Sequence, residues 1–185
     1  DYRELVDLRT IVDFDDVNHV TCTPEPTDGF GNEVPADVSE AAQSVDVLVR
    51  FGFGFLVGDV LNAPTHGTLS FHHGDFRKYR WRPAGFWEFL HDEEEVGITL
   101  QRLNDKLDAG EVVVEKTSRI DDCDTWQAIK HRLFTESSSM LAEGIQQLSR
   151  EEFTPTQLTD IGSMYTRPAA LDYLRYLWKN TTGRL

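Results

Sequence analysis

Positively charged side chains are scarce in this chain. Its 185 residues include 18 Lys and Arg against 32 Asp and Glu, which gives a formal net charge of −14. Nucleic-acid phosphates would be repelled by most of such a surface, so nonspecific nucleic-acid binding is disfavoured and any anion site must be local. Lysine is rarer than arginine, a balance typical of proteins from salt-loving organisms, although an acidic protein from an ordinary habitat would look similar.

Cysteines and long apolar runs are also scarce. Cys22 and Cys123 lie far apart without partners at metal-ligand spacing, so two free thiols of a cytoplasmic protein explain them better than a disulfide framework or a zinc site. Charge or glycine interrupts every apolar run before the roughly 18 residues that a membrane-spanning helix needs. The start, DYRELVDLRT, lacks the pattern of a secretory signal. We expect a soluble, cytoplasmic protein without a membrane partner.

Strand and helix patterns alternate over residues 45–150. The β-branched run 45–53 is typical of a strand in a parallel sheet, and residues 58–64 and 67–73 read as a short helix and the next strand of a β-α-β crossover. Further patterns predict a helix over 83–91, strands over 96–103 and 112–120, and one long amphipathic helix over 124–150 with Asp122 or Asp124 as N-cap. The α/β class follows.

Three parts of the chain are expected. Residues 1–44 form an N-terminal segment that is partly loop, with a short helix from Ser39; residues 45–150 form the core; residues 151–185 form a tail that ends in a helix over 169–180. The length suits one domain with a sizeable core.

His72 and His73 lie at the end of a predicted strand, where ligand crevices form in open α/β sheets. Alternation places one imidazole on each face, so only one need be functional. Asp108 lies in the turn LDAGE between two strands, where an aspartate is usually a turn former. If Asp108 met a histidine, it would raise the imidazole pKa and fix its tautomer, as general acid-base catalysis requires. The spacing leaves both readings open.

The ordered combination LSFHHGDFRKYRWRPAGFWEFL, GITLQRL and LDAGEVV resembles the folate-dependent formyltransferase family, which includes methionyl-tRNA formyltransferase, glycinamide ribonucleotide transformylase and the sugar-amine formyltransferases. In that family a strand ends in Asn-x-His, a basic loop and a helix follow, and a Gly-x-Thr strand precedes a Leu-Asp-x-Gly turn. The resemblance covers about residues 45–150 and implies an open sheet with a Rossmann-type β-α-β core. Residues 1–44 show no counterpart of the family's first β-α unit, which suggests a fragment that lacks the N-terminal part of the fold.

The resemblance implies a set of site residues. His72 and Asp108 match the catalytic His and Asp, and Ser70 stands where the family has Asn. The formyl donor would be 10-formyltetrahydrofolate, with no metal. A charged His72 held by Asp108 would stabilise the tetrahedral oxyanion, and a water on Asp108 would relay a proton. The loop at the place of the pteridine site holds Phe51, Gly52, Phe53, Gly54, Phe55 and Leu56. The cations offered to the acceptor are Arg77, Lys78, Arg80 and Arg82, which could equally be solvated loop charges.

Three functions remain open at this point. The leading hypothesis is transfer of a one-carbon formyl group to an amine of a small metabolite, such as a sugar nucleotide. The alternatives are a 10-formyltetrahydrofolate hydrolase and a non-catalytic protein with the formyltransferase fold. Ser70 favours the alternatives and the pair His72 and Asp108 favours catalysis. For the site itself, one further hypothesis is that its residues are rearranged around Ser70, with His73 or a water in place of the missing Asn amide.

Overall fold

The fold centres on a five-stranded mixed sheet. The computed structural model describes the whole chain except residues 1–9, 11–16, 81–82, 105–109, 166–167 and 184–185. The strands of the central sheet, in spatial order, are β3 (Leu48–Arg50), β4 (Thr68–His73), β6 (Glu95–Arg102), β7 (Glu111–Arg119) and β8 (Thr156–Gln157). Only β3 and β4 pair in parallel; the remaining neighbours are antiparallel. The predicted α/β class is confirmed.

The parallel pairing of β3 with β4 confirms the expected crossover between these strands, but the connection contains no α-helix. Residues 58–64 were expected to form a short helix, and the structure has a single 3₁₀ turn there, Asp59–Leu61, with Val60 and Leu61 buried. The Thr68 hydroxyl donates to the Val60 carbonyl at 2.9 Å and ties this turn to the start of β4. The crossover therefore fixes the register of β3 on β4.

Smaller elements lie around this sheet. They are α1 (Ala36–Ala42), α2 (Phe86–Leu90), the pair β1 (Glu25–Pro26) with β2 (Asn32–Glu33), and the pair β5 (Tyr79–Arg80) with β9 (Ser163–Met164). Helix α1 begins after Pro35, earlier than the predicted start at Ser39. Residues 151–165 thus contribute strands to two sheets, β8 to the central one and β9 to the pair with β5.

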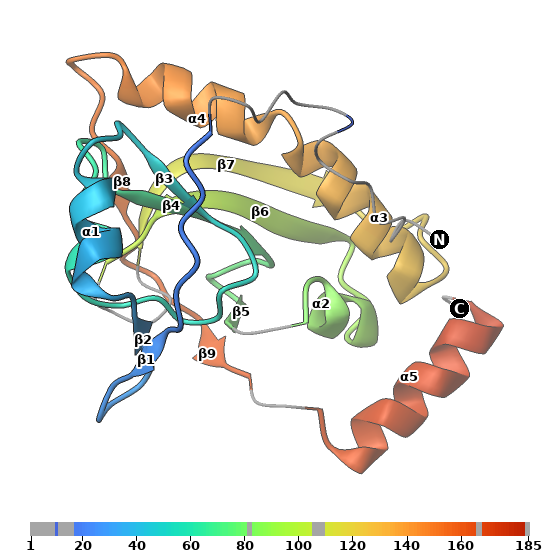
Figure 1. The fold of residues 1–185 in the computed structure, drawn as a ribbon. Coiled ribbons are helices and arrows are strands. Elements are labelled where there is room, and N and C mark those ends of the chain that lie inside the picture. Colours follow the sequence, from blue (N-terminus) through green and yellow to red (C-terminus); the bar gives the residue numbers. More distant parts are fainter. Residues whose placement is uncertain (1–9, 11–16, 81–82, 105–109, 166–167, 184–185) are drawn as a thin grey trace.

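The long predicted helix is two helices, α3 (Trp126–Ser137) and α4 (Met140–Leu148). The Ser137 and Ser138 hydroxyls donate to the carbonyls of Phe134 and Thr135, a competing local bond that favours a helix end. The N-cap is Thr125, whose hydroxyl accepts from the Ala128 amide at 3.1 Å, and not Asp122 or Asp124. Both helices lie over one face of the sheet (Figure 1). The core there contains Leu69, Ile98, Leu100, Val114, Ile129, Leu133 and Met140.

Helix α5 (Ala170–Thr182) forms as predicted and lies beside α2 at the edge of the molecule (Figure 1). Tyr176 packs on Phe86 with ring centroids 5.7 Å apart, and the buried Lys179 ammonium pairs with Asp92. Four large apolar side chains of α5 are exposed: Leu171, Leu174, Leu177 and Trp178.

A β-bulge interrupts the pairing of β6 with β7. Leu100 pairs with Val114 and Gln101 pairs with Val112, which leaves Val113 as an extra residue on β7. Val113 and Val114 are consecutive and both only 5% exposed.

Candidate functional site

The face of the sheet opposite α3 and α4 is polar. In register, Arg50 pairs with Ser70 and Ser70 with Gln101, while His72 pairs with Thr99 and Thr99 with Glu115. Paired residues and every second residue share a face, so these side chains belong to one side of the sheet. We call this set the polar face: Arg50, Ser70, His72, Thr99, Gln101 and Glu115.

Arg50 and Ser70 are hydrogen-bonded at the carboxyl end of β3. The guanidinium donates from Nη2 at 2.7 Å and from Nε at 3.1 Å to the Ser70 hydroxyl oxygen. Ser70 is 1% exposed. The sequence analysis missed Arg50, although a single arginine at the end of the apolar run VDVLVR was a detectable signal. The position of the family's Asn is thus occupied by Ser70, whose hydroxyl oxygen accepts hydrogen bonds from the Arg50 guanidinium.

His72 lies on the same face as Ser70. Its ring stacks on Phe76 with centroids 3.7 Å apart, and its Nε2 is buried without a hydrogen-bond partner among the described residues. Burial, followed by the neighbouring His73, lowers the His72 pKa from 6.5 to about 3, against a backbone hydrogen bond with Tyr79 that raises it. Among the described residues these surroundings favour a neutral imidazole, whereas the expected charged form depends on Asp108, which lies outside them.

Glu88 of α2 is a buried carboxyl near His72 that the sequence analysis also missed. A Cβ added to Gly74 would lie 3.1 Å from His72 Nε2 and 3.4 Å from Glu88 Oε1, so both atoms face the same small volume. Glu88 is 2% exposed and accepts from the Asp75 amide at 3.2 Å. Burial raises its pKa from 4.5 to about 7. A proton acceptor or donor that titrates near neutrality thus lies beside the imidazole.

His73 belongs to the opposite face. Its Nε2 lies 3.1 Å from the Ser137 hydroxyl, and its ring packs on Phe134 of α3 at 4.6 Å. Burial lowers its pKa to about 4. His73 therefore does not take the place of the missing amide at Ser70, as one form of the rebuilt-site hypothesis required.

Gln101 links the polar face to Gly110, the first described residue after Asp108. Its Oε1 is buried and has no hydrogen-bond partner among the described residues. A Cβ at Gly110 would collide with this atom and with the Arg102 carbonyl, so the Gly110 backbone lies directly against Gln101. Asp108 itself is outside the described residues.

The expected pteridine segment follows Arg50 directly. Phe51 is 69% exposed and stacks on Phe71 at 6.2 Å. Gly52 and Gly54 have φ of 67° and 82°, a conformation that side-chain-bearing residues rarely adopt. Beyond them, Phe53 packs on the small cluster around Leu56, and Phe55 meets Phe30 edge-on at 5.8 Å; Leu56 is buried. The segment thus presents one exposed aromatic ring, which packs on Phe71 and lies on the His73 side of the sheet.

The predicted acceptor cations are paired within the chain. Arg77 forms a two-pronged ion pair with Glu115, Lys78 pairs with Glu93 at 2.6 Å, and Arg80 donates to the Gly162 carbonyl at 2.7 Å. Arg82 lies outside the described residues. Arg77 lines a hollow of about 270 Å³ beside β7 and β8, together with Val112, Glu115, Thr156, Gln157, Leu158, Thr159 and Asp160.

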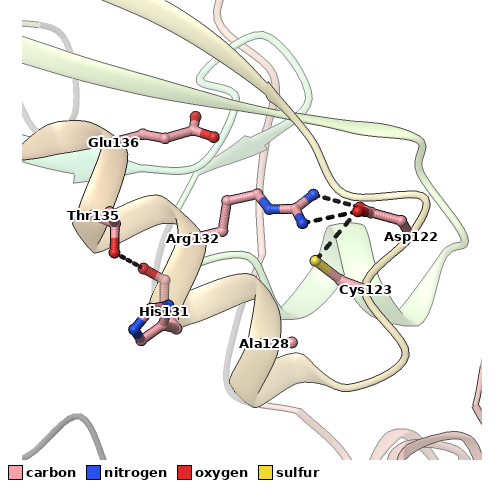
Figure 2. A pocket seen from close by; sticks show the side chains of 7 residues that line it. All are labelled: Asp122, Cys123, Ala128, His131, Arg132, Thr135 and Glu136. Carbon is pink, nitrogen blue, oxygen red and sulfur yellow. Dashed lines mark hydrogen bonds and ion pairs between the residues drawn. The ribbon is translucent and has the colours of Figure 1, made fainter.

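A second hollow, of about 400 Å³, lies along α3 (Figure 2). The Arg132 guanidinium pairs with both oxygens of Asp122, and this partner holds the Asp122 pKa below its usual range. The Cys123 thiol lies 3.9 Å from the same carboxylate. The hollow shares no residue with the polar face. In the part of the chain that the structure describes, we find no cluster of three metal-ligating side chains and no helix long and apolar enough to cross a membrane.

Comparisons with known proteins identify relatives of this chain. A sequence model of the formyl transferase family matches residues 15–145. Methionyl-tRNA formyltransferase from Thermotoga neapolitana is 30% identical over 108 residues, which are 58% of this chain and 34% of that protein. The chain spans about a third to a half of the length of the curated relatives it matches.

Solved structures agree on the fold. The formyltransferase PseJ from Anoxybacillus kamchatkensis, in complex with UDP-4,6-dideoxy-4-formamido-L-AltNAc and tetrahydrofolate, superposes with a TM-score of 0.58 at 19% identity, over 73% of this chain and 70% of that one. The N-formyltransferase from Helicobacter canadensis, with folinic acid and dTDP-3-aminofucose, gives a TM-score of 0.56 at 17% identity, over 69% and 48%. The formyltransferase-like fold expected from the sequence is confirmed.

Proposed function

Because the chain belongs to the formyl transferase family, we propose that its polar face transfers the formyl group of 10-formyltetrahydrofolate to an amine. The observation that carries the proposal is the buried, unpartnered Nε2 of His72 on the same face as Ser70. A buried ring nitrogen without a partner costs free energy unless a substrate or water supplies one.

The reaction needs two things from the protein. The acceptor nitrogen forms a bond to the formyl carbon, the carbonyl oxygen becomes an oxyanion, and the bond from carbon to the folate N10 then breaks. The acceptor loses a proton to a base, and N10 gains one, so tetrahydrofolate leaves neutral at that nitrogen. A neutral His72 can take the proton from the attacking amine, and donors on the same face can stabilise the oxyanion.

The folate fits the segment that follows β3. Phe51 offers an exposed ring for a flat heterocycle, and Gly52 and Gly54 leave the backbone uncovered beside it. Gln101 Oε1, buried and unpartnered among the described residues, provides an acceptor on β6, which β4 separates from β3. When bound, the folate supplies the activated formyl group. These residues would hold and orient it.

The acceptor fits the hollow beside β7 and β8. Glu115 and Asp160 line this hollow with Arg77, and Thr99 links Glu115 to His72 across the strands. Two carboxylates and one paired cation suit an amino group better than a naked phosphate. We therefore favour the amine of a small metabolite, and sugar nucleotides are the first class to test because structural neighbours were solved with them.

The test is consumption of 10-formyltetrahydrofolate by the purified chain. Parallel reactions receive dTDP-3-aminofucose, methionyl-tRNA or no acceptor, and the appearance of tetrahydrofolate and of the formylated product is measured. Faster turnover with the amino sugar supports the proposal. Turnover that is equal without acceptor indicates the hydrolase alternative, and no turnover in any reaction rejects the activity of this chain.

A further inference from the structure

We propose that Glu88 is a positioning residue of this site: its carboxylate accepts the hydrogen bond, and then the proton, of His72 Nε2, directly or through one water. His72 Nδ1 is then the nitrogen that takes the proton of the attacking amine. This role rests on the proposed formyl transfer and assigns the group that receives the proton after His72. It is carried by the convergence of the two side chains at Gly74.

Three polar atoms face one point beside Gly74. A Cβ on Gly74 would lie 3.1 Å from His72 Nε2, 3.4 Å from Glu88 Oε1 and 3.6 Å from the Tyr79 carbonyl oxygen. The sum of the first two distances limits the separation of Nε2 and Oε1 to about 6.5 Å, which a direct hydrogen bond or one bridging water can span. Nε2 is buried, and both of the atoms that face it there are oxygens.

The loop after β4 holds Glu88 against His72. The Asp75 amide donates to Glu88 Oε1 at 3.2 Å. A Cβ at Gly97 would lie 3.1 Å from Asp75 Cα and 3.3 Å from the Gly74 carbonyl oxygen, so this loop runs directly against β6. Glu88 is 2% exposed in a helix whose five residues are all buried. Its carboxyl is therefore fixed in place by backbone contacts and kept away from bulk water.

The surrounding oxygens select one tautomer of the imidazole. A neutral imidazole carries its proton on one nitrogen and a lone pair on the other. The Tyr79 carbonyl and an ionised Glu88 can only accept hydrogen bonds, so we assign the proton of His72 to Nε2 and the lone pair to Nδ1. His72 as a whole is partly exposed although its Nε2 is buried. The acceptor amine can therefore meet the imidazole on the side away from Glu88.

The proton path through the pair is balanced. As the amine attacks the formyl carbon, its nitrogen gives a proton to Nδ1, and His72 releases the proton of Nε2 to Glu88. His72 is then neutral again and Glu88 is a carboxylic acid. When the bond from carbon to N10 breaks, the reverse path delivers one proton to N10 and Glu88 regains its charge. Because burial disfavours an imidazolium at this position, a second proton acceptor beside it eases the transfer.

The charges around Glu88 place its ionisation in the range of an assay. Burial raises its pKa from 4.5 to about 7, against hydrogen bonds from the backbone of Glu88 and of Asp75, and the carboxylates of Asp75 and Glu93 add to the rise. Lys78 is near enough for Glu88 to raise the lysine pKa, and His72 is the remaining titratable group at this point. The ionised form that the path needs thus prevails above about pH 7.

The first experiment compares pH profiles of kcat. Formyl transfer to the best acceptor of the preceding assay is measured between about pH 5.5 and about pH 8.5 for the unmodified chain, Glu88→Gln and the exposed control Glu151→Gln. The ratio of kcat between the unmodified chain and a variant cancels the ionisation of the amine. For Glu88→Gln we expect a ratio near one at the acid end, where Glu88 is protonated and resembles Gln, and about tenfold or more at the alkaline end.

The same reactions separate this role from binding and folding. The KM for the acceptor, the calorimetric affinity for tetrahydrofolate and the unfolding temperature of Glu88→Gln at the alkaline end should stay close to those of the unmodified chain. Glu151→Gln should give a kcat ratio of one at every pH. A purely structural role of Glu88 would not make the kcat ratio follow the ionisation of its carboxyl.

The second experiment tests the contact at Gly74. Gly74→Ala places a methyl group against both Nε2 and Oε1, and should lower kcat about tenfold at alkaline pH in the unmodified chain but have little further effect in Glu88→Gln. Gly29→Ala is the matched control, because its Cβ has nothing within 4 Å. NMR of the His72 ring nitrogens gives a readout without turnover: their signals should shift as Glu88 ionises in the unmodified chain, and not in Glu88→Gln.

Three results would overturn this role. A kcat ratio for Glu88→Gln that does not change with pH, in a chain that does transfer formyl groups, refutes the role of Glu88 and leaves the proposed function intact. Loss of tetrahydrofolate binding or of the folded state in the same variant shows a binding or structural role. If the unmodified chain shows no turnover with any acceptor or with water, the proposed function itself fails, and the role of Glu88 in it fails as well.

Discussion

His72 and His73 are neighbours in the chain whose imidazoles lie on opposite faces of one strand: His72 stacks on Phe76, and His73 contacts Ser137 and Phe134. This arrangement allows a matched pair of substitutions. His72→Gln should lower kcat by about a hundredfold or more through loss of a general base. His73→Gln should leave kcat nearly unchanged and cost about 1 kcal/mol of folding free energy through its lost contact with Ser137. Steady-state kinetics and urea unfolding of both variants decide this, and equal kinetic effects would contradict it.

Gly110→Ala should destabilise the fold and disturb the site. The added Cβ would collide with Gln101 Oε1 and lie 2.6 Å from the Arg102 carbonyl oxygen, so backbone must move. We expect a loss of about 1 to 3 kcal/mol, typical of overpacking, measured by urea unfolding. Gly29→Ala is the matched control, because a Cβ there has nothing within 4 Å. Equal stability of the two variants would show that the Gly110 contact relaxes without cost.

The stability of the fold should depend on pH through His72, His73 and Glu88 in opposite directions. The lowered pKa values of the histidines contribute stability above pH 6.5 that is lost as pH falls toward about 4 and then about 3, since the unfolded chain then binds more protons. The raised pKa of Glu88 contributes stability below pH 4.5 that is lost as pH rises through about 7.

Glu88→Gln isolates the second contribution. The variant cannot ionise, so its free energy of unfolding should rise more steeply between pH 4.5 and 7 than that of the unmodified chain. Urea unfolding at several pH values in this window measures the difference. Parallel curves for the two proteins would mean that Glu88 titrates normally in the folded chain.

Asp92→Ala should release α5 from α2. Lys179 is 3% exposed and its ammonium pairs with Asp92, while the exposed Arg175 reaches the same carboxylate at 3.7 Å. Removal of the carboxylate leaves a buried cation with weaker compensation and should cost roughly 2 to 3 kcal/mol. Arg175→Met, which breaks only the exposed pair, should cost less than about 1 kcal/mol. Hydrogen exchange of the α5 amides reports both, and similar protection in the two variants would refute the difference.

Concentrated salt should stabilise the chain. A net charge of −14 destabilises the compact state through self-repulsion, which salt screens. An increase from about 0.1 M to about 2 M KCl is expected to raise the unfolding temperature, as the salt-adapted interpretation of the composition predicts. A lower unfolding temperature at high salt would contradict the expected relief of self-repulsion.

Local patterns predicted much of the fold, whereas the site depended on contacts between distant segments. The strands around His72 and Ile98 followed from alternation of apolar residues, and α5 followed from helical periodicity. The break between α3 and α4 was missed because apolar periodicity continues through the serines at 137–139, whose hydroxyls bond locally.

The two unpredicted members of the site show the limit most clearly. Arg50 meets Ser70 only because the crossover sets one particular register between β3 and β4, and no local pattern specifies that register. Glu88 looks like the polar residue of an amphipathic turn in FWEFL, yet all five residues of α2 are buried. Burial of a carboxyl depends on what covers it, which the sequence of that turn does not show.

The bulge at Val113 shifts the alternation of side chains along β7 by one residue. Beyond it, Glu115 faces the polar side with Thr99, and before it Val112 faces that side with Gln101, so odd and even positions exchange faces at this point. Deletion of Val113 would restore strict alternation and leave both Val112 and Glu115 on the polar side, because these two residues would then lie two positions apart. A relative without this extra residue therefore keeps both halves of the strand on the same faces when the alignment gap is placed at Val113, whereas a gap elsewhere in the strand would assign the wrong face to the residues between the gap and Val113.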